Sequence, residues 1–283
     1  MSQPPACDER AGHEDQAEAS LHVHFINLDR SKDRLAEFLA ANRHLGEVTR
    51  VRAFDKDGID IHALTQQGLV TPDILSAYPV GAVCLALGFY GLWNRAIETG
   101  KNMTISEDDV IFNLDFDACA ADVIKTLPPD WDLVHWGWNF DSYIVIDILP
   151  GVTSCVAKCD EAKMRLNTRA FQEQSLSPRA LRLRCLFGTP CYTVSPKGAQ
   201  TLKSKIFPLR PDIFPWPDEL LPKPSPTTHL KNVGIDIALI SLYRQINAYV
   251  CVPPLVITKN EKSKSTIQAR KSPVPPAHLT HMR

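Results

Sequence analysis

The sequence lacks the features of a membrane-spanning or secreted chain. The uncharged stretch from Tyr78 to Asn94 is short and contains three glycines, whereas a spanning helix needs about 20 mostly apolar residues. The first ten residues show neither the basic region nor the apolar region of a secretory signal. These absences predict a cytoplasmic protein, and they leave open a peripheral contact with one face of a membrane.

Zinc-binding and nucleic-acid-binding signatures are also absent. Of the eight cysteines, the one close pair, Cys155 and Cys159, has no second pair at the spacing of a zinc site. We therefore expect reduced thiols, which agrees with a reducing compartment. The basic stretch at residues 158–184 carries no base-reading motif, so no nucleic-acid partner is expected.

Charge is divided unevenly along the chain, although the formal net charge is only −1. Residues 1–140 carry 22 acidic and 11 basic side chains, whereas residues 141–283 carry 10 acidic and 20 basic ones. This division suits a cleft in which a metal site faces an anion-binding wall, and also self-association or an anionic membrane surface. The basic stretch 158–184 has two interpretations, a solvated loop or a flap that recognises an acceptor molecule.

Hydrophobic periodicity predicts an α/β protein. Residues 21–28 and 48–54 have the pattern of strands, and between them Ser31 is placed to cap a helix that Gly46 ends. This strand–helix–strand order predicts a mainly parallel sheet flanked by helices. Further helices are predicted at 80–99, 115–127, from 196 and at 236–245, and further strands at 102–106, 131–138, 142–149, 188–194 and 249–252. We expect one domain over residues 21–268, with disordered segments at 1–20 and 269–283.

Three consecutive carboxylates, Glu107, Asp108 and Asp109, follow the strand predicted at 102–106. Ligands of open α/β sheets bind at the carboxyl ends of the strands, and oxygen ligands suit a hard cation such as Mg²⁺ or Mn²⁺. Side chains alternate along an extended backbone, so Glu107 and Asp109 are expected to face one way and Asp108 the other. The alternative interpretation is a solvated turn after an edge strand.

Five segments, taken in order, resemble glycosyltransferase family 25, which includes lipooligosaccharide and collagen galactosyltransferases. They are Ile26–Arg30 with Arg34, Arg52–Gly58, the helix Gly81–Trp93, Ile105–Asp109, and Gly188–Leu202 leading on to Asp236. The resemblance implies a GT-A-like, Rossmann-type fold in a single domain. It also implies a UDP-sugar donor, Mn²⁺ (or Mg²⁺) at the acidic motif, and inverting transfer, in the first instance of galactose, to a glycan, glycolipid or protein acceptor.

The resemblance also suggests roles for single residues. Asp109 is the expected metal ligand, with Glu107 ligating the metal or holding a metal-bound water, while Asp108 binds the ribose or the sugar. Asp236 is the expected catalytic base, because an inverting transfer needs a group that takes the proton of the acceptor hydroxyl. A helix N-cap is the structural alternative for Asp236.

The end of the first strand is expected to form the nucleotide edge of the site. The residues concerned are Asn27, Arg30, Arg34 and Asp55. Arginines there can hold phosphate in fork geometry, and Asp55 can accept a hydrogen bond from uracil or ribose. An exposed helix position is the alternative for Arg34, and a turn-forming aspartate before Gly58 is the alternative for Asp55.

The long central helix departs from the family pattern. Cys84-Leu85 and Gly88-Phe89 stand where the family is expected to have Gly-Cys and Ser-His. A hydroxyl and an imidazole near the donor are therefore missing, and Phe89 suits core packing instead. These departures motivate a second hypothesis, a catalytically silent relative that binds nucleotide. A third hypothesis is metal-dependent nucleotidyl transfer.

Overall fold

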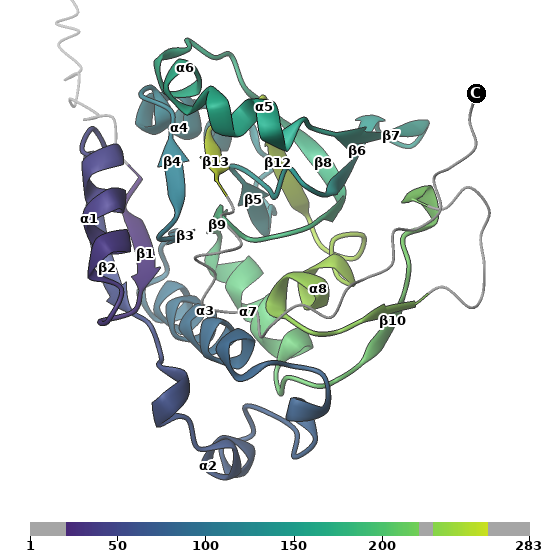
Figure 1. Cartoon of the computed structure of the whole chain (residues 1–283). Helices are drawn as coiled ribbons and strands as arrows, with labels where there is room; N and C mark the ends of the chain where they lie inside the picture. The colour runs from purple at the N-terminus through teal and green to yellow at the C-terminus, as the bar shows by residue number, and fades with distance from the viewer. Residues whose placement is uncertain (1–20, 221–228, 260–283) are drawn as a thin grey trace, which may run out of the picture.

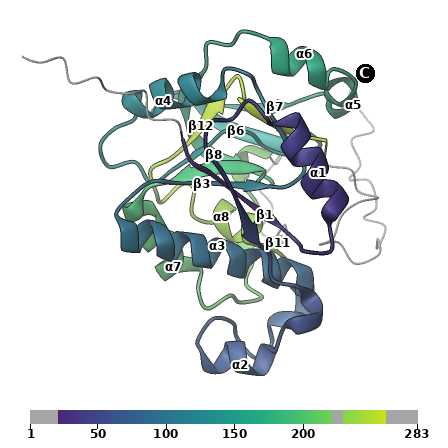
Figure 2. The ribbon, with the colours of Figure 1, turned by 90° about the vertical axis from the view of Figure 1, so that its left-hand side faces the viewer.

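The computed structural model describes residues 21–220 and 229–259, which form one nine-stranded sheet with helices on both faces (Figures 1 and 2). The lead-in predicted at 1–20 and the tail predicted at 269–283 lie outside the described residues. The strands in spatial order are β2 (Val48–Arg52), β1 (Val23–Asn27), β3 (Met103–Glu107), β9 (Cys191–Val194), β5 (Leu133–His135), β12 (Ala248–Val252), β8 (Arg179–Leu186), β6 (Tyr143–Leu149) and β7 (Thr153–Lys158).

Eight α-helices in the described residues surround this sheet. They are α1 (Lys32–Ala41), α2 (Ile61–Gln66), α3 (Val80–Thr99), α4 (Phe116–Thr126), α5 (Glu161–Leu166), α6 (Thr168–Glu173), α7 (Pro196–Ile206) and α8 (Ile235–Ile240). Two small antiparallel pairs complete the fold, β4 (Val110–Phe112) with β13 (Val256–Thr258), and β10 (Ile213–Pro215) with β11 (His229–Lys231).

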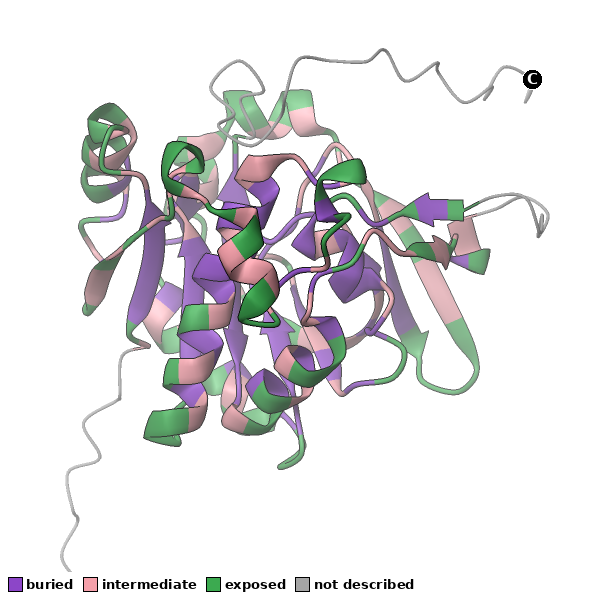
Figure 3. Ribbon diagram, turned by 90° about the horizontal axis from the view of Figure 1, so that it is seen from below, coloured by how far each residue is buried: buried purple, intermediate pink, exposed green. Residues whose placement is uncertain are grey.

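The sheet separates two apolar cores. Helices α3 and α7 cover one face, whereas α1 and α4 lie on the other, as Figure 2 shows. Because side chains of a strand alternate between faces, Phe25 of β1 packs into the second core while its neighbour Ile26 packs into the first. Burial therefore covers both faces of the inner strands (Figure 3).

The predicted α/β class with a helix-flanked sheet is confirmed, and so is the parallel opening. Strand β1 pairs in parallel with both β2 and β3, and β5 pairs in parallel with β12. Strand β9 runs antiparallel to its neighbours β3 and β5, and β8, β6 and β7 continue antiparallel, so the sheet as a whole is mixed. One consequence matters for the site: the start of β9 lies at the same edge as the ends of β1 and β3.

Helix α1 differs from its prediction at both ends. Ser31 precedes the helix, but its side chain makes no capping hydrogen bond. The helix ends at Ala41, before Gly46, and the next residue is the buried Asn42. The Asn42 amide donates to the Val110 carbonyl at 3.0 Å and accepts from the Phe112 N–H at 2.9 Å. Asn42 thus attaches the end of α1 to strand β4.

The prediction of an irregular basic stretch at residues 158–184 is wrong. This segment forms α5, α6 and most of β8, which is an inner strand of the sheet. Arginines and apolar residues alternate along β8, a period of two that is typical of a strand. Arg182 donates to Asn247 at 2.9 Å, and Arg184 donates to Asp147 at 2.8 Å. The apolar stems of arginines can pack against a sheet while their charged ends reach polar partners. A high content of arginine is therefore compatible with a strand.

Helix α3 is the one described helix that is long and apolar enough to cross a membrane. Its composition has another explanation here, since Phe89 and Trp93 are fully buried in the first core. The Phe89 ring meets the Tyr192 ring edge-on at 5.4 Å between centroids, which confirms the expected core packing. At Gly88 an added Cβ would lie 3.1 Å from the Ile26 side chain, so the helix approaches β1 closely there.

Candidate functional site

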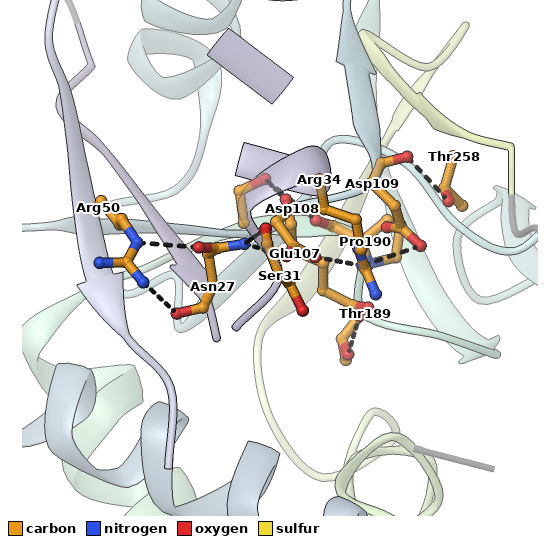
Figure 4. A network of polar contacts seen from close by, with 11 residues as sticks. Asn27, Ser31, Arg34, Arg50, Glu107, Asp108, Asp109, Thr189, Pro190 and Thr258 are labelled. Carbon is orange, nitrogen blue, oxygen red and sulfur yellow. Dashed lines mark hydrogen bonds and ion pairs between the residues drawn. The ribbon is translucent and has the colours of Figure 1, made fainter. Parts of the chain in front are cut away.

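The three predicted acids occupy the turn between β3 and β4. Glu107 is the last residue of β3, and Asp108 and Asp109 form the turn before Val110 (Figure 4). Strand β4 is held from two sides, by Asn42 and by its pairing with β13. The Glu107 N–H also donates to the Pro190 carbonyl at 2.9 Å. The backbone of the turn is therefore fixed before any ligand binds.

Asp108 points back toward the end of β1. One of its oxygens accepts from the Asn27 amide at 2.6 Å, and the other accepts from Arg34. Burial raises the pKa of Asp108, although the Arg34 charge opposes the rise. Since both oxygens are engaged by the protein, the structural contribution of Asp108 is to connect the turn to β1 and α1.

Glu107 and Asp109 lie close enough to repel each other. Glu107 accepts a hydrogen bond from the Thr189 hydroxyl at 3.1 Å, and Asp109 lies 3.5 Å from the Arg34 guanidinium. Burial raises the pKa of Glu107 to about 8, and the charge of Asp109 adds to this rise. Burial also raises the pKa of Asp109, against the opposing charge of Arg34. A single guanidinium thus faces three carboxylates, so all three can ionise together only at a cost that a further cation would offset.

The carboxylates of Glu107 and Asp109 fit a cation site whose other ligands come from a bound phosphate and from water. Within residues 21–220 and 229–259, no group of three His, Cys, Asp or Glu side chains forms a complete metal cage. Mg²⁺-type sites on phosphate ligands commonly use only one or two carboxylates and take further oxygens from the phosphates and from water. Glu107 and Asp109 supply such a pair of carboxylates.

A cavity of about 510 Å³ lies beside the turn. Its polar wall includes Arg34, Asp108, Asp109 and Lys259. Its remaining lining residues come from α1 and β4, namely Glu37, Phe38, Ala40, Ala41, Val110 and Ile111. The Arg34 Nε is buried and has no hydrogen-bond partner among the described residues, so it remains a free donor. The volume falls within the range of small-molecule sites, about 300–1,000 Å³.

The structure does not bring Arg30 and Asp55 to this cavity. They form an ion pair with each other, and both side chains are exposed to solvent. Asp55 also accepts from the Asp57 N–H at 3.3 Å at the start of a 3₁₀ turn, Lys56–Gly58. The turn-forming alternative therefore describes Asp55 in this structure, and the nucleotide contacts of Arg30 and Asp55 stay predictions.

Asp236 lies at the start of helix α8, outside the acidic turn. It lies in the first turn of α8, two residues after the N-cap Gly234, so it is not the N-cap itself. Its carboxylate accepts from the N–H groups of Ile237 and Gly188, while burial raises its pKa. Gly188 directly precedes Thr189, the hydrogen-bond partner of Glu107. Asp236 is not among the residues that line the described cavity.

Three contributors to the site were not predicted. Arg50 of β2 donates to the Asn27 side chain at 2.9 Å and thereby orients the amide that holds Asp108. Thr189 binds Glu107, and Lys259 lines the cavity. Arg50 lies in the period-two segment 48–54, which predicts its strand, and the parallel pairing of β2 with β1 brings it beside Asn27. Thr189 and Lys259 reach the site through the sheet topology, for which the sequence gives no local signal.

Of the comparisons with known proteins, the match to a family model identifies the family. The model of glycosyltransferase family 25, described as LPS biosynthesis protein, matches residues 20–214. The chain is also similar to a solved structure of mouse xyloside xylosyltransferase 1 in its apo form, with 10% identity and a TM-score of 0.34. That similarity covers 81% of this chain and 71% of the mouse chain. No curated protein matches. Since the family model spans more than half of the sequence, this chain belongs to glycosyltransferase family 25.

Proposed function

We propose that this family 25 glycosyltransferase moves a sugar, in the first instance galactose, from a UDP-sugar to an acceptor hydroxyl with inversion, and that it requires Mn²⁺ or Mg²⁺. The observation that carries the proposal is the crowding of three carboxylates around one guanidinium, beside a ligand-sized cavity. An uncompensated acidic pair is costly without a cation, and a phosphate-bearing donor would bring one with it. The proposed acceptor belongs to a glycan, glycolipid or protein, met in the cytoplasm or at a membrane face.

The three acids of the turn have different proposed roles in binding the donor. Glu107 and Asp109 would hold the divalent cation, which when bound offsets the negative charge that grows on the departing diphosphate. Asp108 fixes the turn through Asn27 and Arg34. The free Nε of Arg34 and the ammonium group of Lys259 supply positive charge to the cavity, where the phosphates would lie.

Asp236 is the proposed base. Burial raises its pKa toward the range in which a carboxylate accepts a proton well, and hydrogen bonds from the backbone N–H groups of Ile237, Gly188 and Asp236 itself hold the carboxylate. It stands on the other side of the Gly188 turn from the acidic pair. This position suits attack by an acceptor hydroxyl on the face of the sugar opposite the departing diphosphate.

The proposal is tested first by binding and then by turnover. The thermal unfolding temperature is measured with a panel of UDP-sugars and of other nucleotide-sugars, each with Mn²⁺, with Mg²⁺ and with EDTA. We expect metal-dependent stabilisation by UDP-sugars, followed by release of free UDP when acceptors are added. Release of pyrophosphate would favour nucleotidyl transfer instead. Binding without any turnover would favour the catalytically silent relative that Gly88 and Phe89 suggest.

The role of Asp236 has a separate test. Asp236→Asn keeps the shape of the side chain and removes the base, so kcat should fall about 10²- to 10⁴-fold. The affinity for Mn²⁺ and UDP should stay at the wild-type value, because Glu107 and Asp109, and not Asp236, are the proposed ligands of the cation. Unchanged kcat would exclude Asp236 as the base.

A further inference from the structure

The turn Gly188-Thr189-Pro190 contacts both carboxylates to which the proposed function gives separate tasks. The Thr189 hydroxyl donates to Glu107 at 3.1 Å, and the Pro190 carbonyl accepts the Glu107 N–H at 2.9 Å. On the other side, the Gly188 N–H donates to Asp236. Figure 4 shows Thr189 and Pro190 next to Glu107. The turn is thus a short covalent link between the cation side and the base side of the site.

This turn is held rigidly by its surroundings. Gly188 has a φ of +81°, and a Cβ at this position would lie 2.3 Å from the Asn139 side chain. The Asn139 N–H in turn donates to the Phe187 carbonyl at 3.1 Å. Thr189 is buried and leads into β9, which pairs with β3 on one side and with β5 on the other. A hydroxyl mounted on such a support has little freedom to move away from Glu107.

We propose that Thr189 is a positioning residue, whose hydroxyl orients the Glu107 carboxylate for cation binding. A glutamate side chain rotates about three bonds, and a hydrogen bond to one of its oxygens fixes the plane of the carboxylate. Hydrogen bonds of this kind to metal-ligating groups contribute about 10- to 100-fold to metal affinity or activity. The inference rests on the proposed function, because it takes Glu107 as a ligand of the cation.

Thr189→Val tests this role, because it removes the hydroxyl and keeps the branched shape. Binding is measured from the electron paramagnetic resonance signal of free Mn²⁺, titrated with the full chain in the presence of UDP. We expect Thr189→Val to bind Mn²⁺ about 10- to 100-fold more weakly than the wild type. Thr189→Ser keeps the hydroxyl and should restore the affinity. Thr189→Ala, which also lacks the hydroxyl, should weaken binding as Thr189→Val does.

Thr193→Val is the matched control. Thr193 is a buried threonine of β9, the strand that follows Thr189, and its hydroxyl bonds Thr104 and Trp136 at 2.8 Å each instead of a carboxylate. Its loss should lower the unfolding temperature and leave the Mn²⁺ affinity unchanged. Wild-type Mn²⁺ affinity in both Thr189→Val and Thr189→Ala would overturn the role of Thr189 alone. Absence of Mn²⁺ binding by the wild type would overturn the proposed function together with it.

Discussion

Two highly charged regions of this chain fold in opposite ways. The acidic turn Glu107–Asp109 gathers three carboxylates around one guanidinium, that of Arg34. Strand β8 carries three arginines, and two of them, Arg182 and Arg184, have their own partners, an amide with an aromatic ring and a carboxylate respectively. In the acidic turn the carboxylates outnumber their cationic partner. In strand β8, by contrast, Arg182 and Arg184 each have a partner of their own.

The difference separates charge that serves a ligand from charge that serves the fold. In an ion pair of the sheet the two charges neutralise each other without a ligand, and the arginine stem also covers apolar surface. A buried cluster with excess charge is tolerated where a ligand supplies the missing counter-charge. Sequence composition alone cannot make this distinction, because both regions are simply runs of charged residues.

The largest effect is expected from Asp109→Asn. It removes a carboxylate from the cation site, and metal stabilisation of a departing diphosphate contributes several kcal/mol, so metal-dependent transfer should fall about 100-fold or more. The measurement is UDP release over a range of Mn²⁺ concentrations. Asp122→Asn, an exposed acid of α4 that pairs with Lys125, is the control and should behave as the wild type. Equal activity of the two variants would contradict the metal site.

An intermediate effect is expected from Arg34→Gln, which increases the excess of negative charge. Without nucleotide, Mn²⁺ should bind about tenfold more tightly, because the competing guanidinium is gone. The metal-free protein should unfold at a lower temperature, since Asp108 loses a partner, and Mn²⁺ should restore part of that loss. Calorimetric titration measures the affinity. Arg52→Gln, a strongly exposed arginine paired with Asp29, should leave the affinity as it is.

The dependence of stability on pH gives a smaller signal from the same turn. The folded chain holds the Glu107 proton up to about pH 8, whereas the ordinary pKa is 4.5. The folded state then binds more protons than the unfolded state between these values, so stability should fall as pH rises through this window. The charged or titratable groups near Glu107 are Arg34, Asp108, Asp109, Cys191 and Tyr192.

Glu107→Gln isolates this contribution. Unfolding temperatures of the metal-free wild type and of the variant are compared from pH 4.5 to pH 8, with the shift in pKa as the physical cause. The wild type should lose stability more steeply than the variant over this window. Parallel curves would show that Glu107 does not hold its proton in the folded state.

The smallest effect on activity is expected from a change in strand β8, where Arg182 and Arg184 have partners within the fold. Arg184→Gln removes the partner of the buried Asp147 and should cost about 1–3 kcal/mol of the free energy of unfolding. At about 2–4 °C per kcal/mol for a chain of this size, the unfolding temperature should fall by several degrees. Mn²⁺ affinity and kcat at a temperature where the variant is folded should be unchanged. A change in Mn²⁺ affinity would show that the two regions communicate.

Local patterns predicted much of the fold. The strand–helix–strand opening, the buried helix α3 and the start of α7 at Pro196 follow from local sequence patterns, and the structure confirms each of them. The identity of β8 was missed because arginine content was given more weight than alternation. The antiparallel place of β9 could not be predicted, because the pairing of distant strands depends on the whole topology.

The acidic residues of the candidate site could be predicted from the sequence, but the hydrogen bonds that hold them could not. The run Glu107–Asp109 is visible in the sequence, and the structure places it beside a cavity. The engagement of Asp108 by Asn27, and of Glu107 by Thr189, arises from residues about 80 positions apart. Arg30 and Asp55 show the reverse case, in which two plausible ligand contacts satisfy each other.

The Asn27 amide limits how this site can diversify. Its NH₂ group serves Asp108 while its oxygen serves Arg50, so an aspartate would lack the donor and a leucine would lack both groups. Relatives that alter donor choice are therefore expected to keep this asparagine and to vary the α1 wall of the cavity, at Ala40 and Ala41. Donor specificity would then change at the cavity wall, while the hydrogen bonds of Asn27 to Asp108 and Arg50 stay the same.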